Sequence, residues 1–240
     1  MPTEEGGVGL LGSLLALGLL LGLKHALEAD HVSTVATLAS RSASTRQTLG
    51  VAAAWGLGHA AALVGLGTAL IGLGATLPEN VSRMLELAVG VILVVLGAGV
   101  LRRLRQKRIH LHFHEHDGVR HLHAHAHAGA RGTHDSAHDH GHRPLLWRRP
   151  LLIGGVHGLA GTAAITVLAL PVGGSAAQAL LYLLVFGCGS ILGMLALSVV
   201  VSLPFRVAAR HLGRVAFGLE ALLGVADVAI GAWIVLVVSR

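Results

Sequence analysis

Long apolar stretches make up most of this chain, and short polar segments separate them. An α-helix needs about 20 predominantly apolar residues to cross the hydrocarbon core of a bilayer. Stretches of that length cover residues 8–39, 49–75, 81–101, 150–170, 176–203 and 212–238. The pattern predicts an all-α integral membrane protein with six transmembrane helices. Because the first stretch exceeds one straight crossing, we expect its helix to tilt, break or protrude.

The composition supports a compact bundle of membrane helices. Hydrophobic residues make up 53% of the chain, charged residues 12%, and the mean hydropathy is +0.71. Glycine accounts for 33 of 240 residues, and small residues let membrane helices pack closely. The net charge of +6 would favour nucleic-acid binding in a soluble protein. Here the basic residues lie mostly between apolar stretches, so we expect a role in membrane orientation and no nucleic-acid partner.

Lys and Arg indicate the side of the membrane on which each link lies, because basic residues concentrate in cytoplasmic loops. They cluster in the links after the first, third and fifth stretches, whereas Arg83 and Arg240 lie near the opposite ends. This distribution predicts a multi-pass protein of the cell membrane with both termini outside. The long segment after the third stretch is then cytoplasmic.

This long segment, residues 105–149, is rich in histidine. Its candidate metal-binding residues are His110, His112, His114, His116, His121, His123, His125, His127, His134, His138, His140 and His142. Few apolar residues are present to form a core, so we expect the loop to be disordered without a ligand. Histidine-rich tracts bind transition metals through neutral imidazoles; a solvated spacer is the alternative. Such a tract would select poorly among nickel, cobalt, copper and zinc.

The two hydrophobic halves repeat. Matching motifs are Leu85-Glu86-x3-Gly90-Val91-x5-Gly97 with Leu219-Glu220-x3-Gly224-Val225-x5-Gly231, Gly22-x2-His25-x-Leu27 with Gly154-x2-His157-x-Leu159, and Gly58-His59 with Gly189-Ser190. The chain therefore divides into a three-helix repeat over 1–104, the loop over 105–149 and a second three-helix repeat over 150–240. Since each repeat has an odd number of spans, the second is inverted, and inverted repeats are typical of transporters with a midplane substrate site.

A polar cluster interrupts the first apolar stretch and carries the main candidate ligands, His25, Asp30 and His31. On a regular helix these three side chains would point in three directions. Either the helix unwinds between them, which we favour, or one of them supports a ligand without binding the ion. Glu28 lies four residues after Lys24, and we interpret this pair as an ion pair, with metal ligation by Glu28 as the alternative.

Two further histidines occupy the predicted bundle. His59 lies between glycine and alanine in the second stretch, and His157 is the repeat counterpart of His25 in the fourth. Each is either a ligand or a hydrogen-bonded core residue, and we favour ligands. Glu86 and Glu220 hold equivalent repeat positions, which indicates a shared architectural role. Imidazoles with one carboxylate suit nickel, cobalt or zinc.

The motif His25-Ala-Leu-Glu-Ala-Asp30-His31 resembles the His-x4-Asp-His signature of the nickel/cobalt transporter (NiCoT, NicO) family. Leu57-Gly58-His59 is similar to that family's Leu-Gly-His motif, and residues 155–164 are similar to its UreH-type branch. The resemblance implies secondary transport of Ni²⁺ or Co²⁺ across the plasma membrane. It also implies His25, Asp30, His31 and His59 as substrate-site residues. The histidine-rich loop resembles the efflux branch, against which Asp30 argues.

The leading interpretation is a secondary transporter that takes up Ni²⁺ or Co²⁺ as its substrate, without enzymatic activity or an organic cofactor. Efflux is one alternative, and a membrane-anchored metal-storage or chaperone protein is an alternative of another class. A metalloenzyme is disfavoured because the sequence has no His-Glu-x-x-His pattern and no nucleophile beside a base. A haem protein is disfavoured by the aromatic content of 3%. A cytoplasmic nickel chaperone is a candidate partner, and the oligomeric state stays open.

Overall fold

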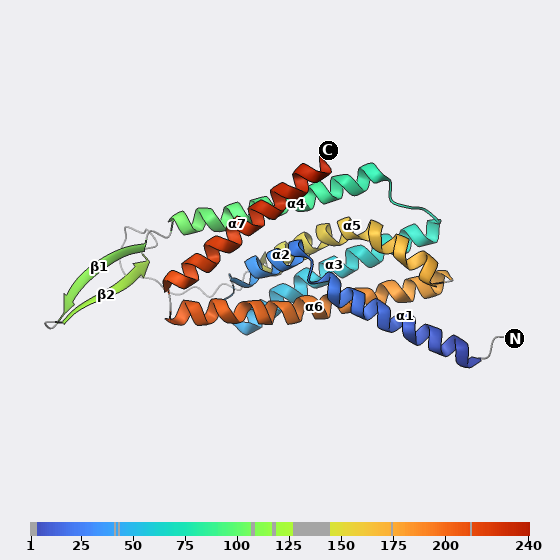
Figure 1. Cartoon of the computed structure of the whole chain (residues 1–240), viewed down its shortest axis with the longest axis horizontal. Coiled ribbons are helices and arrows are strands. Elements are labelled where there is room, and N and C mark those ends of the chain that lie inside the picture. The colour runs from blue at the N-terminus through green and yellow to red at the C-terminus, as the bar shows by residue number, and fades with distance from the viewer. Residues whose placement is uncertain are drawn as a thin grey trace.

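The computed structural model describes residues 4–40, 42, 44–106, 109–116, 119–126, 145–173, 175–211 and 213–240. The side chains of residues 1–11, 107–146, 163–174, 206 and 209–213 lie outside this description. The elements, shown in Figure 1, are α1 (Glu4–His25), α2 (Ala29–Ser40), α3 (Thr45–Leu73), α4 (Glu79–Gln106), β1 (Ile109–His116), β2 (Val119–Ala126), α5 (Leu145–Gly173), α6 (Ala176–His211) and α7 (Gly213–Val238).

The helices have the length and composition of membrane spans. Among the residues searched, α3 and α4, together with Ala176–Phe205 of α6 and Arg214–Val238 of α7, are each long and apolar enough to cross a bilayer. The bent pair Gly12–His25 and Ala29–Ser40 makes a fifth span if it counts as one. The prediction of a helical membrane protein is therefore confirmed. The predicted span 150–170 falls in α5, partly on residues whose side chains are not described, so six spans stay a prediction.

The helix of the first apolar stretch is broken, as the sequence analysis favoured. Helix α1 ends at His25, α2 begins at Ala29, and their axes differ by 61°. Hydrogen bonds continue through the break, from the amide of Leu27 to the carbonyl of Lys24 (2.9 Å) and from Glu28 to His25 (3.1 Å). At the break, Ala26 is fully inaccessible, whereas Leu27 is 62% exposed and Glu28 lines a cavity. Non-helical backbone inside a membrane is tolerated under these conditions.

Local signals fix the ends of α3 and the start of α4. The hydroxyl of Ser44 accepts a hydrogen bond from the amide of Gln47 (3.2 Å), which caps α3 at its N-terminus. Gly74 ends α3 with φ of 58°, a left-handed conformation that glycine adopts without steric cost. Pro78 precedes α4, and its carbonyl accepts from the amides of Val81 and Ser82 (3.0 Å each).

Glycines allow the helices to approach each other backbone to backbone. A Cβ atom at Gly22 of α1 would overlap with the carbonyl oxygen of Phe186 in α6. A Cβ atom at Gly154 of α5 would overlap with the carbonyl oxygen of Trp55 in α3. The two contacts are equivalent, because Gly22 matches Gly154 and Trp55 matches Phe186 in the internal repeat. Each contact therefore recurs when the two halves are exchanged.

The pair formed by α4 and α7 follows the same rule. A Cβ atom at Gly90 would lie 2.9 Å from the carbonyl oxygen of Gly231, and one at Gly231 would lie 2.5 Å from that of Gly90. Gly97 and Gly224 contact each other in the same reciprocal way. Since Gly90 matches Gly224 and Gly97 matches Gly231 in the repeat, exchanging the halves converts one contact into the other. A two-fold relation between the halves requires this pattern.

A buried carboxylate joins α2 to α7. Asp227 is fully inaccessible and accepts hydrogen bonds from the hydroxyls of Ser33 and of Thr37, the latter at 2.5 Å. Ser33 and Thr37 lie one turn apart on α2. Because hydroxyl groups satisfy the carboxylate inside the bundle, the contact fixes α2 against α7.

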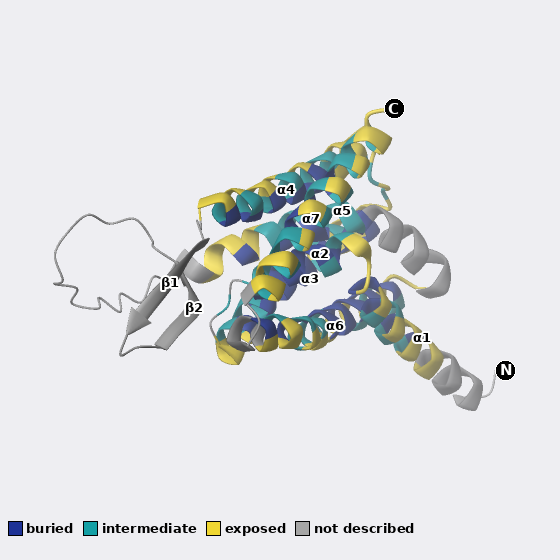
Figure 2. Ribbon diagram, turned by 60° about the vertical axis from the view of Figure 1, so that its left-hand side comes forward, coloured by how far each residue is buried: buried dark blue, intermediate teal, exposed yellow. Residues whose placement is uncertain are grey.

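The packed interior runs through the centre of the bundle (Figure 2). One cluster joins α3 to α6 through Leu63, Tyr182, Leu183 and Phe186. A second surrounds the helix break and includes Ala26, Val35, Trp55 and Met194. Large apolar side chains such as Leu20 and Val95 are 61% and 64% exposed, which suits a surface that faces lipid.

Part of the histidine-rich loop forms two strands, β1 and β2, which the sequence analysis did not predict, while its disorder without a ligand stays a prediction. Strands β1 and β2 form an antiparallel hairpin whose register places His110 opposite His125, His112 opposite His123 and His114 opposite His121. In Figure 1 the hairpin lies at the end of the bundle where α4 ends. The prediction missed the alternation of histidine with Leu, Phe and Ala, a period-two pattern typical of strands. His127, His134, His138, His140 and His142 lie outside the described residues.

We predict that the glycine contacts control stability. Gly154→Ala forces a methyl group into the backbone of α3 and should destabilise the protein by about 1–3 kcal/mol, the usual cost of overpacking. Gly65→Ala is the matched control, because no atom lies within 4 Å of its added Cβ. Thermal unfolding in detergent should show a clearly lower midpoint for Gly154→Ala and no loss for Gly65→Ala. Equal midpoints would contradict the packing described here.

Candidate metal centre

Three buried histidines meet at the break in the first span. His25 ends α1, His31 lies in the first turn of α2, and His59 comes from the middle of α3. The ring centroids are 4.4 Å apart for His25 and His31, 5.2 Å for His25 and His59, and 5.0 Å for His31 and His59. One nitrogen from each ring lies within 4.8 Å of the other two. The change of axis at the break permits this, because it turns two nearby histidines toward one point.

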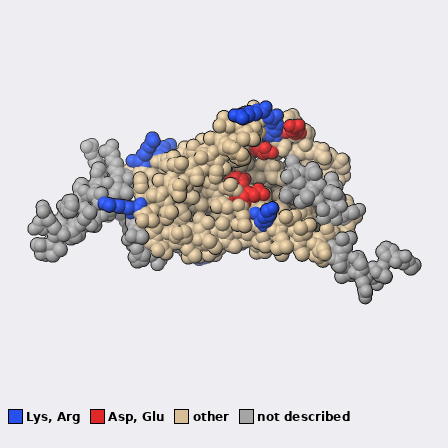
Figure 3. Space-filling model, viewed as in Figure 1, with Lys and Arg blue, Asp and Glu red and all other residues tan. Residues whose placement is uncertain are grey.

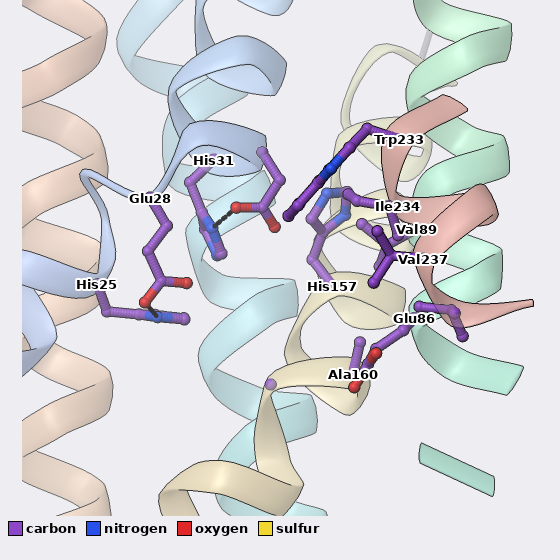
Figure 4. Close-up of a pocket in the computed structure, with 13 residues that line it drawn as sticks. His25, Glu28, His31, Glu86, Val89, His157, Ala160, Trp233, Ile234 and Val237 are labelled. Carbon is purple, nitrogen blue, oxygen red and sulfur yellow. Dashed lines mark hydrogen bonds and ion pairs between the residues drawn. The ribbon is translucent and has the colours of Figure 1, made fainter. Parts of the chain in front are cut away.

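Carboxylates hold two of these rings through their Nδ1 atoms. Oδ1 of Asp30 lies 2.9 Å from Nδ1 of His31, and Oε1 of Glu28 lies 3.0 Å from Nδ1 of His25. Figure 4 shows both contacts as dashed lines. A carboxylate on one ring nitrogen fixes the orientation of the imidazole and leaves the other nitrogen for a metal ion. Each histidine thus presents Nε2 as its candidate ligand atom.

The histidines also contact one another. Nε2 of His25 lies 3.2 Å from Nε2 of His59, close enough for one ring to donate a hydrogen bond to the other. A metal ion bound by both nitrogens would replace that bond, since it needs both lone pairs. The two side chains are 7% and 0% exposed, so bulk water is largely absent from this contact.

His157 joins the group from α5. Its ring centroid lies 5.8 Å from that of His31, and its Nδ1 donates to the carbonyl of Ile153 at 3.0 Å. Gly158 brings this part of α5 against α3, because a Cβ atom there would overlap with the carbonyl oxygen of His59. His157 is therefore held beside the three-histidine cluster with Nε2 as its remaining nitrogen.

Several polar atoms at this site lack partners. Within the described residues, Nε2 of His31, Nε2 of His157 and Nδ1 of His59 are buried without a hydrogen bond. A buried unsatisfied polar group costs about 1–3 kcal/mol. Three of them at one point mark a place built to receive something polar. Neutral imidazoles suit nickel, cobalt, copper or zinc better than magnesium or calcium.

Each acidic residue of the motif contacts a histidine. Asp30, predicted as a ligand, forms a hydrogen bond with His31. Its carboxylate also belongs, with Glu28 and His31, to a second group of side chains that could hold a metal ion. Glu28, interpreted as a partner of Lys24, instead contacts His25, with its side chain 58% exposed. Its position at the rim leaves it free to approach a cation that enters the site.

Trp55 forms an apolar wall that the sequence analysis did not identify. Its ring lies 5.4 Å from His31, 6.0 Å from His59 and 5.7 Å from His157, and it is fully buried. The signal was its position one helical turn before His59, on the same face of α3. This wall keeps the imidazoles close together and dry.

A cavity of about 290 Å³ leads to the cluster. Asp30, His31 and His157 line one side of it, and Glu86 and Trp233 line the other. Figure 4 shows Glu86 and Trp233 on the side away from His25 and His31, with His157 between them. Glu86, to which the sequence analysis gave an architectural role, therefore lies on the way to the site.

These features define a helical membrane protein with a buried imidazole cluster that could hold a transition-metal ion. The chain is 34% identical over 200 residues to the urease accessory protein UreH of Bacillus sp. (strain TB-90), a match that covers 83% of this chain and 81% of that protein. No family model and no solved structure matches the chain. The chain belongs to the UreH branch of the nickel/cobalt transporter family.

We predict that Asp30 positions a ligand and that His31 is one. In a background with the loop histidines replaced by serine, Asp30→Asn should weaken Ni²⁺ binding by about 10–100-fold, the usual effect of losing a partner of a ligating histidine. His31→Ala should weaken binding further, because the ligand itself is lost. Calorimetric titration of the purified protein with Ni²⁺ measures both. If Asp30→Asn binds as poorly as His31→Ala, the carboxylate is itself a ligand.

Proposed function

We propose that the protein is a secondary transporter that takes up Ni²⁺ or Co²⁺ across the cell membrane. The buried cluster of His25, His31 and His59 at the broken helix carries this proposal. Ionisable groups inside a membrane are costly and mark substrate pathways. A dehydrated divalent cation has a reason to occupy such a site, because the imidazoles replace the water that it loses. Membership of the UreH branch supports the same substrate.

The proposed site comprises His25, His31, His59 and His157, with Asp30 and Glu28 as the partners of two of them. These residues come from α1, α2, α3 and α5, and so from both halves of the chain. A carrier needs its site at such a boundary, because moving one half against the other can then open the site to each side in turn. The exchange-related glycine contacts support an inverted arrangement of 1–104 and 150–240 around this boundary.

The orientation of the protein is proposed from its basic residues. Figure 1 places the beginning of α1 and the α3–α4 link at one end of the bundle, and the hairpin at the other. Arg102, Arg103 and Arg105 end α4 at the hairpin side. By the excess of Lys and Arg in cytoplasmic loops, the hairpin end is cytoplasmic and both termini are outside.

The histidine-rich loop, residues 105–149, then receives ions that leave the bundle on the cytoplasmic side. Its histidines can hold transition-metal ions and so oppose their return. A cytoplasmic nickel chaperone could collect them there. Efflux would use the loop in the opposite sense, to gather ions for release, so the direction of transport is the property to measure.

We predict that transport depends on the bundle histidines. Purified protein in liposomes should accumulate radioactive nickel, and His59→Ala should reduce the rate to that of empty liposomes, because the central ligand is gone. His121→Ala makes the same chemical change in the loop and should transport normally. Accumulation by His59→Ala at the normal rate would exclude this site. In cells, faster loss of nickel on expression of the protein would reverse the proposed direction.

We predict that the loop assists transport without being required for it. Deletion of residues 110–142 removes the accessory ligands but leaves the bundle site, so nickel uptake into liposomes should fall without being abolished. Complete loss of nickel uptake and binding, in a protein that still unfolds at its normal temperature, would favour the storage interpretation, in which the helices are only an anchor.

A further inference from the structure

Two cavities lie one after the other between α4 and α7. The first, of about 290 Å³, contains the histidine site at its inner end. The second, of about 380 Å³, is lined by Glu79, Ser82 and Arg83 at the beginning of α4. Both cavities are lined by Glu86, Val237 and Val238. Because they share these lining residues, we infer that the two cavities form one route from the ends of α4 and α7 to the imidazole cluster.

Glu86 carries the negative charge at the point where the cavities meet. It lies two turns into α4 from Glu79, about 10 Å along the axis, and among the described residues its carboxylate accepts one long hydrogen bond, 3.4 Å, from Ser82. Figure 3 shows acidic side chains beside a hollow on this face of the molecule. The charge of Glu86 therefore faces the route.

The neighbouring cation is held away from Glu86. Nε and Nη2 of Arg83 donate to the carbonyl of Val238 at 3.2 and 2.8 Å. Among the residues that the structure describes, no ion pair joins Arg83 to Glu86. The hydrogen bonds tie Arg83 to the C-terminal end of α7, so this guanidinium does not neutralise the carboxylate.

We propose that Glu86 is a capture site for hydrated divalent cations on the route to the histidine cluster. This inference rests on the proposed function and deepens it. At the inner end of the route, Nε2 of His31 and Nε2 of His157 are buried without a hydrogen-bond partner, in residues that are each 2% exposed. The exposed carboxylate of Glu86 attracts the hydrated ion, and the imidazoles then replace its water.

The route indicates the side of the membrane from which the histidine site is accessible in this conformation. Glu79, Glu86 and the end of α7 lie at the end of the bundle that the basic residues place outside. The histidine site is therefore reached from outside in the present conformation. A negatively charged route on that side favours collection of cations for uptake, because it raises their concentration where they enter.

Glu220 is the matched control that the internal repeat provides. It occupies on α7 the position that Glu86 occupies on α4, eight residues into a helix that begins at the hairpin end. If the two glutamates only serve architecture, their substitutions should have the same effect. If Glu86 captures ions on the outer route, only its substitution should change uptake.

The kinetic test compares Glu86→Gln with Glu220→Gln in liposomes that take up Ni²⁺. Glu86→Gln should raise KM by about tenfold, the lower range of electrostatic focusing by a charged cleft, with kcat nearly unchanged. The difference should shrink at high ionic strength, because salt screens an exposed charge, whereas a purely structural defect would persist. Glu220→Gln should keep the normal KM. An unchanged KM in Glu86→Gln, or equal rises in both variants, overturns the proposal.

An accessibility test needs no transport. In a Cys188→Ala background, which removes the single cysteine of the chain, Glu86→Cys should react with a membrane-impermeant thiol reagent added outside intact cells. Ni²⁺ should slow this reaction by binding nearby. Glu220→Cys should not react from outside. Labelling of Glu86→Cys only from the cytoplasmic side overturns the outer route. If the wild-type protein moves no nickel at all, the proposed function fails instead, whatever the labelling shows.

Discussion

Inside a bilayer, non-helical backbone is tolerated only where its polar groups are paired and it is buried in protein or lines a cavity. The break between His25 and Ala29 meets this constraint, and the rest of the site depends on it. Hydrogen bonds from Leu27 and Glu28 keep the backbone paired through the turn. The 61° change of axis turns His25 and His31 toward each other and toward His59. Without the break, the same residues would face lipid or separate neighbours.

The close approach of the other helices supports this break. Gly22 lets α6 contact α1 just before it, and Gly158 lets α5 contact α3 beside His59. Asp227 fixes α2 from the other side through Ser33 and Thr37, so the direction of His31 depends on α7 as well as on its own helix. Glycine therefore removes the side-chain volume between helix backbones, and the polar contacts fix how far one helix is shifted along its neighbour.

Much of this arrangement could be predicted from the sequence, because its signals are local. On an unbroken helix His25, Asp30 and His31 would point in three directions. A break between them was therefore expected, and the structure has one. The contact of Glu28 with His25 and the place of Glu86 in the cavity were not expected. Each depends on where a side chain points within a packed bundle, which spacing along one helix does not determine. The hairpin was missed because low apolar content outweighed the alternation that favours strands.

The repeat explains why one site forms where symmetry would allow two. Exchange of the halves places His157 at the position of His25, and it places Ser190, fully buried, at the position of His59. The second half also has Thr162 and Ala163 where the first has Asp30 and His31. It therefore contributes one imidazole and mainly surfaces for packing, while the first half contributes three. A symmetric protein would have two equivalent sites, one on each side of the two-fold axis. An ion released from one site could then bind to the other. Among the described residues, the histidines of the bundle therefore gather in one cluster, and the proposed carrier, which exposes one site alternately to the two sides, requires no more than that.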